Sequence, residues 1–237
     1  MNRNNLLYVF ILFTFTVSGL FDIQGFGQPL PVQISQKAPL KEDQILYNGK
    51  VWHNLYNNVK GDQFLFSKEY LQGSLTIDGK LYNNLSISYD IYNDEIITPS
   101  NNGSILQLNK EMVDSFTLVF EFKTYMFKNT LEDSLTGVKG FVNVLYKGKS
   151  ALYVKYKKEI QLLAVDDKYD LFIESFHIYF LKDGIVHQLN NKSDLLKILY
   201  QDKAQIKDFI KKNKLKVSKK VPESFIPVIR YYDSISH

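Results

Sequence analysis

The histidine and serine side chains that most often carry enzyme chemistry stand in no recognised catalytic pattern. The four histidines are His53, His177, His187 and His237. No two of them have the HxH or HxxxH spacing that lets neighbouring imidazoles share a zinc ion. No serine lies in a GxSxG or SxxK motif. We therefore expect no metal site, no cofactor and no enzyme built on a local motif.

Two short acidic runs are the next candidates. Neither has the alternating oxygen ligands and central glycine of a calcium loop. We interpret both as turns and solvated strand edges. The acid pair of a glycosidase is assembled in space rather than along the chain, so a hydrolase stays open as an alternative. The runs are Asp166, Asp167 and Asp170, and Asp90, Asp94 and Glu95.

Lysines give the clearest binding signal. Lys155, Lys157 and Lys158 lie in one strand-like segment, interleaved with Tyr153 and Tyr156. Clustered ammonium groups attract phosphate, sulfate and carboxylate groups. We predict that these five residues bind an anionic partner. A second basic stretch, residues 192–220, holds ten lysines against three aspartates.

Residues 1–27 have the composition of a signal peptide. Arg3 supplies a positive charge, Leu6–Phe21 is apolar, and Gly25-Phe26-Gly27 forms a small-x-small site before Gln28. The apolar run is shorter than the ~20 residues that a spanning helix needs. We expect a cleaved leader and an exported protein without a transmembrane helix. It would reside in the periplasm, at the outer membrane or outside the cell.

The composition narrows the classes of partner and of chemistry. The chain has no cysteine, which excludes disulfides, thiol catalysis and zinc–thiolate sites. Its net charge is only +4. Exported proteins rarely meet nucleic acid, so we expect an envelope protein or an anionic glycan or lipid as the partner, and no nucleic acid.

Period-two alternation dominates residues 45–189, after a proline-containing linker at 28–44. Phe116, Leu118, Phe120 and Phe122, for example, fall on one face of an expected strand. Alternation of this kind is typical of antiparallel sheets with one buried face. Four glycine dipeptides predict the turns between strands. They are Asn48-Gly49, Asp78-Gly79, Lys147-Gly148 and Asp183-Gly184.

The pattern becomes helical from residue 190 to residue 237. Ser193 is the expected N-cap of a first helix. Asp202 would begin a second helix, with Gln205 as its capping-box partner. Pro222 would open a third, in which Pro227 would remove a hydrogen bond.

The expected fold is therefore a single β-rich α+β domain over residues 45–237. An antiparallel meander would form a sandwich or a partly open barrel, capped by two or three C-terminal helices. The favoured function is a non-catalytic envelope protein that binds a partner protein or an anionic surface polymer. A carrier of a small apolar ligand in a barrel cavity is the second hypothesis, and the hydrolase is the third.

Several stretches resemble a family of uncharacterised exported envelope proteins of Gram-negative bacteria. The resemblance covers nearly all of the chain after the leader. It implies export and a single fold, and it implies no activity, ligand or functional residue. The matching stretches are YNGKVW (47–52), GDQFLF (61–66), LNKEMVDSF (108–116), KGFVNVLY (139–146), LYVKYKK (152–158) and PVIRYYDS (227–234).

Overall fold

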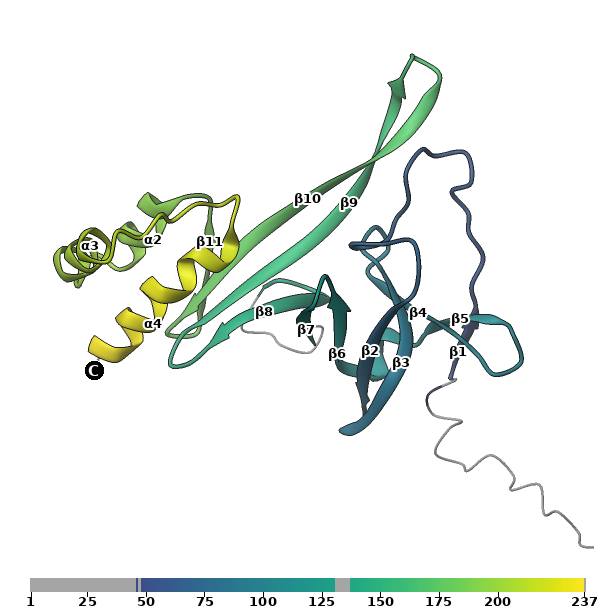
Figure 1. Ribbon diagram of the computed structural model, residues 1–237, viewed down its shortest axis with the longest axis horizontal. Coiled ribbons are helices and arrows are strands. Elements are labelled where there is room, and N and C mark those ends of the chain that lie inside the picture. Colours follow the sequence, from purple (N-terminus) through teal and green to yellow (C-terminus); the bar gives the residue numbers. More distant parts are fainter. Residues whose placement is uncertain (1–45, 47, 131–136, 237) are drawn as a thin grey trace, which may run out of the picture. The chain divides into compact units, whose positions relative to one another are not determined.

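The structure is a computed structural model that describes residues 46, 48–130 and 137–236. The expected signal peptide at residues 1–27 and the expected linker at 28–44 lie outside the described residues. Eleven strands of the described chain form one antiparallel sheet in the order β1-β5-β4-β3-β2-β6-β7-β8-β9-β10-β11 (Figure 1). The strands are β1 (Gly49–Val51), β2 (Leu71–Ile77), β3 (Lys80–Asp90), β4 (Glu95–Pro99), β5 (Ile105–Leu108), β6 (Val113–Phe120), β7 (Lys123–Asn129), β8 (Phe141–Lys147), β9 (Ala151–Val165), β10 (Tyr169–Lys182) and β11 (Ile185–Leu189).

The helices of the described chain follow the last strand, apart from one short 3-10 turn that precedes β6. Leu189 ends β11, and Lys192 begins the first C-terminal helix. None of these helices has the length and the apolar character that crossing a bilayer requires. The helices are η1 (Lys110–Met112), α2 (Lys192–Ile198), α3 (Lys203–Lys212), η2 (Pro222–Phe225) and α4 (Ile226–Ile235).

The α+β class, the antiparallel meander and the C-terminal helices are confirmed. The sheet does not close, because β1 and β11 are its two edge strands. β9 and β10 are its longest strands, and they pair from Ala151 with Leu181 to Val165 with Tyr169. The outer half of this hairpin continues past the end of β8, whose pairing with β9 stops at Val154 (Figure 1).

Two of the expected glycine turns are two-residue hairpins. Asp78-Gly79 joins β2 to β3 with φ angles of 48° and 75°, and Asp183-Gly184 joins β10 to β11 with 50° and 75°. These positive φ angles define the type I′ turn that matches strand twist. The turn expected at Asn48-Gly49 is wrong. Gly49 begins the edge strand β1, where the backbone carbonyl of Gln107 leaves no room for a Cβ atom.

Phe122 does not continue the alternation of β6. The strand ends at Phe120, and Glu121 and Phe122 form a two-residue turn to Lys123 with φ angles of 48° and 61°. The Phe122 side chain is fully exposed, whereas Phe116 is buried. The sequence misled us because this turn contains none of the Gly, Asn or Asp residues that normally mark such a site.

Two large hydrophobic cores and a smaller third cluster lie along the sheet. The first gathers side chains from β2 to β8, including Tyr89, Phe116 and Phe127. Phe116 and Phe127 stack with ring centroids 4.5 Å apart. The second core joins β9, β10 and β11 to the C-terminal helices. Tyr156 of β9 packs against both cores, with its ring 6.4 Å from that of Phe127 and 6.1 Å from that of Phe176.

The N-cap of helix α2 lies two residues before the expected Ser193. Asn191 is the N-cap, and its Oδ1 accepts a hydrogen bond from the Asp194 backbone N–H at 3.1 Å. Asp202 caps α3 as expected, but its side chain makes no capping hydrogen bond, so the capping box with Gln205 is not formed. Pro227 falls in the first turn of α4. It removes no hydrogen bond there, because the first amides of a helix have no intrahelical acceptor.

Candidate anion-binding site

The three lysines predicted to bind an anion do not all lie on one face of the sheet. Alternation along β9 places Lys155 and Lys157 on one face and Lys158 on the other. The Lys155 ammonium lies 2.6 Å from Asp94 Oδ1 and 3.0 Å from the Phe141 carbonyl oxygen. Burial lowers the pKa of Lys155, and the Asp94 carboxylate opposes that shift. Lys155 therefore joins β9 to the β3–β4 turn inside the protein.

Lys158 is held in the same way on the opposite face. Its Nζ donates to the Phe64 carbonyl oxygen at 2.5 Å and to Asp62 Oδ1 at 3.2 Å, and it lies 3.7 Å from Glu174. Only 11% of its side chain is exposed. Among the three lysines, Lys157 alone is exposed, and it pairs with Glu159 at 2.6 Å.

The two tyrosines of the predicted site lie on opposite faces of β9. Tyr153 is buried and packs with Val142 and Ala151. Tyr156 is partly buried between the two cores, and burial raises its pKa to about 12. Lys157 is thus the one exposed side chain of the five.

Both acidic runs lie at turns between strands, but Asp90 is buried and Asp94 is largely buried, rather than solvated as the sequence predicts. Asp90 is buried, and its Oδ1 accepts the backbone N–H groups of Tyr92 and Asn93 at 2.9 Å, which shapes the β3–β4 turn. Asp166 and Asp167 form the β9–β10 turn, with φ angles of 54° and 51°. In the described part of the chain, no three carboxylate, histidine or cysteine side chains are grouped to hold a metal ion.

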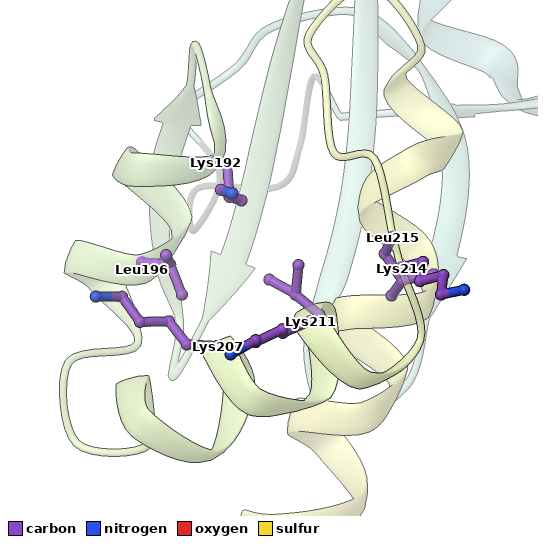
Figure 2. A pocket seen from close by; sticks show the side chains of 7 residues that line it. Lys192, Leu196, Lys207, Lys211, Lys214 and Leu215 are labelled. Carbon is purple, nitrogen blue, oxygen red and sulfur yellow. The ribbon is translucent and has the colours of Figure 1, made fainter.

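A different basic site is formed by the C-terminal helices. A pocket of about 460 Å³ opens between α2, α3 and the segment that follows α3 (Figure 2). This volume lies in the ~300–1,000 Å³ range of small-ligand sites. We call it the helical pocket. It is lined by Lys192, Leu196, Lys207, Ile210, Lys211, Lys214 and Leu215.

Helix α3 sets the arrangement of these side chains. Lys207, Ile210 and Lys211 are spaced i, i+3 and i+4, which puts them on one stripe of the helix, and Lys214 lies in the turn that follows it, with a φ of 52°. Ile210 is buried in the second core, so this face of α3 packs against the protein. Lys207 and Lys211, on either side of Ile210, lie at the edge of the pocket. Figure 2 shows Lys192 and Leu196 reaching the same opening from α2.

The charge of the helical pocket has one sign. Four of its seven lining residues are lysines, and none is acidic. Among the described residues, none of the four ammonium groups forms an ion pair, in contrast to Lys155 and Lys158. The floor is apolar, since Leu196 and Ile210 are buried and Leu215 packs against them. Such a site suits a ligand with both an acidic group and an apolar part.

The excess of lysine in residues 192–220 is visible in the sequence, but it does not single out the residues of the helical pocket. The signal was present in the spacing of Lys207, Lys211 and Lys214 around Ile210. What it lacked was the position of α2, which supplies Lys192 and completes the opening. That position depends on how the helices pack on the sheet.

No protein-family model, curated protein or solved structure matches the chain. The assignment of the site therefore depends on its geometry and charge.

Proposed function

We propose that the protein is a non-catalytic protein of the bacterial envelope that binds an anionic lipid or glycolipid in the helical pocket. Its acidic headgroup would lie among Lys192, Lys207, Lys211 and Lys214. Part of its apolar chain would cover Leu196. The observation that carries this proposal is the set of four lysines around an apolar floor, none of them paired with an acidic side chain in the described part of the protein.

The leader supports the envelope as the place of action. An apolar run at Leu6–Phe21 with a small-x-small site after it is typical of exported proteins. Anionic lipids and glycolipids are what a basic, partly apolar pocket would meet in that compartment.

The proposal is tested with dodecyl phosphate below its micellar concentration, by isothermal titration calorimetry. The Lys207→Gln/Lys211→Gln variant should bind it at least ten-fold more weakly, because two charge-assisted contacts are lost. Dodecyl maltoside, which has the same chain and no charge, should bind weakly or not at all.

The matched control is Lys203→Gln/Lys212→Gln. It removes two positive charges from the same helix, but neither residue lines the pocket. Its affinity should stay within about two-fold of the unmodified protein, because neither side chain lines the pocket and the field of exposed charges is screened by salt. Equal losses in both variants, or equal binding of the uncharged detergent, would argue against the pocket as an anion site.

The outer half of the β9–β10 hairpin favours a second candidate, the binding of an envelope protein. Leu162 and Leu163 are 72% and 56% exposed, and Ile173 is 41% exposed. Exposed apolar side chains grouped on one hairpin are a feature of interaction surfaces. A photo-crosslinking residue at Leu162 should capture one defined envelope protein, whereas the same residue at Leu81, which is exposed on β3, should not. Identical adducts from both positions would contradict this candidate.

The two remaining hypotheses gain less support from the geometry. The apolar-ligand carrier was expected to hold its ligand inside a barrel, and the sheet is open. The aromatic side chains of the first core fill their space by packing on one another. For the hydrolase, Asp94 is paired with Lys110 and Lys155, and Asp90 is hydrogen-bonded into its own turn.

A further inference from the structure

The β6–β7 turn holds an aromatic ring in solvent at a conformational cost. Glu121 and Phe122 both adopt left-handed backbone angles, with φ of 48° and 61°. Asn or Gly would relieve this strain, since bulky L-residues disfavour that region. The Phe122 side chain is also fully exposed. Neither feature helps the fold, so both are better explained by a use for the ring outside the protein.

An ion pair attaches this turn to the C-terminal segment. Lys123 Nζ donates to Glu223 Oε1, and the Lys123 ammonium also lies 4.5 Å from the centre of the Tyr125 ring. Glu223 lies in η2, two residues after Val221, which is 53% exposed. The Lys123–Glu223 ion pair therefore brings the two turns close to one another. Each turn carries an exposed apolar side chain, Phe122 in the first and Val221 in the second.

Lysines flank the second of these turns. Lys216 and Lys220 are exposed, and in the described chain neither forms an ion pair. Lys219 and Lys220 directly precede Val221 in the chain, so the segment that carries this side chain is basic. The acidic residues in these two turns are Glu121 and Glu223, and Glu223 is neutralised by Lys123. Exposed apolar tips among unpaired lysines are the combination that peripheral proteins use on anionic bilayers, where the ring enters the interface and the ammonium groups attract the headgroups.

We propose that the Phe122 turn and the Lys216–Val221 segment dock the protein on the surface of an anionic lipid bilayer, with the Phe122 ring inserted between headgroups. A single projecting ring suits a fluid interface better than the flat surface of a folded protein, which would need a broad apolar face around it. This docking surface uses residues outside the helical pocket and stands independently of it.

A tryptophan probe at position 122 tests the insertion directly. Trp52 is the single tryptophan of the chain, so Trp52→Phe/Phe122→Trp places the only indole in the turn. With vesicles containing 30% phosphatidylglycerol in phosphatidylcholine, its emission should shift to shorter wavelength and be quenched by brominated lipid. With phosphatidylcholine alone, the spectrum should stay that of a solvated indole.

Vesicle sedimentation then tests the contribution of each residue. Phe122→Ser and Lys216→Glu/Lys220→Glu should each weaken binding to the anionic vesicles at least five-fold. Leu55→Ser is the matched control, because Leu55 is 80% exposed but lies in another loop, and it should bind unchanged. All variants carry the same residues 1–45, so any contribution of the leader is common to them.

Two results would overturn the proposal. One is an indole at position 122 that stays solvated on anionic vesicles. The other is a Phe122→Ser variant that sediments like the unmodified protein. Lys207→Gln/Lys211→Gln separates this surface from the helical pocket, since it should lose dodecyl phosphate binding while the indole at position 122 still inserts.

Discussion

Lys155 Nζ lies 2.6 Å from Asp94 Oδ1, and the two residues are 61 positions apart in the chain. Their side chains are only 16% and 18% exposed. Asp94 also accepts the Tyr89 hydroxyl at 2.5 Å and pairs with Lys110. This cluster joins the β3–β4 turn to β9 and to η1, so it connects the first core to the long hairpin.

Replacing Lys155 with methionine should destabilise the fold. The Asp94 carboxylate would keep Lys110 but lose its second partner in a largely buried position, at a cost of about 2–3 kcal/mol. Urea unfolding followed by circular dichroism measures the change. Lys157→Met on the same strand is the control, because Lys157 is exposed, and its midpoint should not move. Equal effects of the two substitutions would show that Lys155 does not act through Asp94.

We expect the free energy of unfolding to fall at alkaline pH, when the Tyr156 hydroxyl ionises. Its pKa is raised by burial to about 12 from its usual 10.0. The folded protein holds this proton more tightly than the unfolded chain, so the stabilisation is complete below pH 10 and is lost as the pH rises from 10 to 12. The partly solvated ring limits the loss to about 2 kcal/mol.

Unfolding free energies at pH 9 and pH 12 test this prediction. Tyr156→Phe has no hydroxyl to ionise at this position. The free energy of unfolding should therefore decrease less between pH 9 and pH 12 in this variant than in the unmodified protein. A variant with the same decrease as the unmodified protein would show that other groups, such as buried Tyr89, account for the alkaline loss.

Asp233 anchors helix α4 to the β8–β9 turn. It is 8% exposed, and it accepts hydrogen bonds from the Ser150 backbone N–H, the Ser150 hydroxyl and the Tyr146 hydroxyl at 3.0, 2.7 and 3.0 Å. In Asp233→Asn, an amide would replace one acceptor oxygen and face a donor. We expect a loss of about 2 kcal/mol in the free energy of unfolding. Asp208→Asn, an exposed change on α3, should leave it unaltered.

The class of the fold was predictable because it depends on local patterns. Alternation along the strands and the Asp-Gly turns at residues 78–79 and 183–184 indicated an antiparallel meander, and the helices follow it. The turn at Phe122 escaped detection because its residues disfavour the backbone angles that they adopt. Only tertiary contacts can impose such a turn, and here Lys123 and Glu223 supply one.

The binding site could not be predicted in the same way. A sequence shows which charged residues are near one another in the chain, but it does not show which of them form ion pairs in the folded protein. Lys155 and Lys158 meet Asp94 and Asp62 across distant segments, so a run that looked basic is largely neutralised inside the protein. The lysines of the helical pocket have no such partners among the described residues. Exposure and pairing, rather than local charge density, distinguish the two clusters.

The signal peptide expected at residues 1–27 gives a prediction for the first residue of the mature protein. With cleavage after Gly27, mass spectrometry of the protein recovered from the envelope of an expressing Gram-negative host should give an N-terminal peptide that begins at Gln28. Gly27→Asp or Gly25→Asp should block processing, because the small-x-small site accepts only small side chains. Recovery of a chain that retains Met1 would indicate an uncleaved anchor instead.

Repulsion between the lysines of the helical pocket should lower the stability of the protein, and this effect can be measured separately from ligand binding. Lys203, Lys207 and Lys211 are spaced i, i+4 and i+8 on α3, so Lys207 has a like charge one turn away on each side. Lys207→Gln removes both repulsions and keeps a good helix former, which should stabilise the fold by about 0.5 kcal/mol at low salt. The gain should shrink in 0.5 M salt, because these charges are screened. The same substitution should weaken dodecyl phosphate binding, so the variant would be more stable and less able to bind. A loss of stability would mean that Lys207 supports the helix, and its placement at the pocket would then need no ligand to explain it.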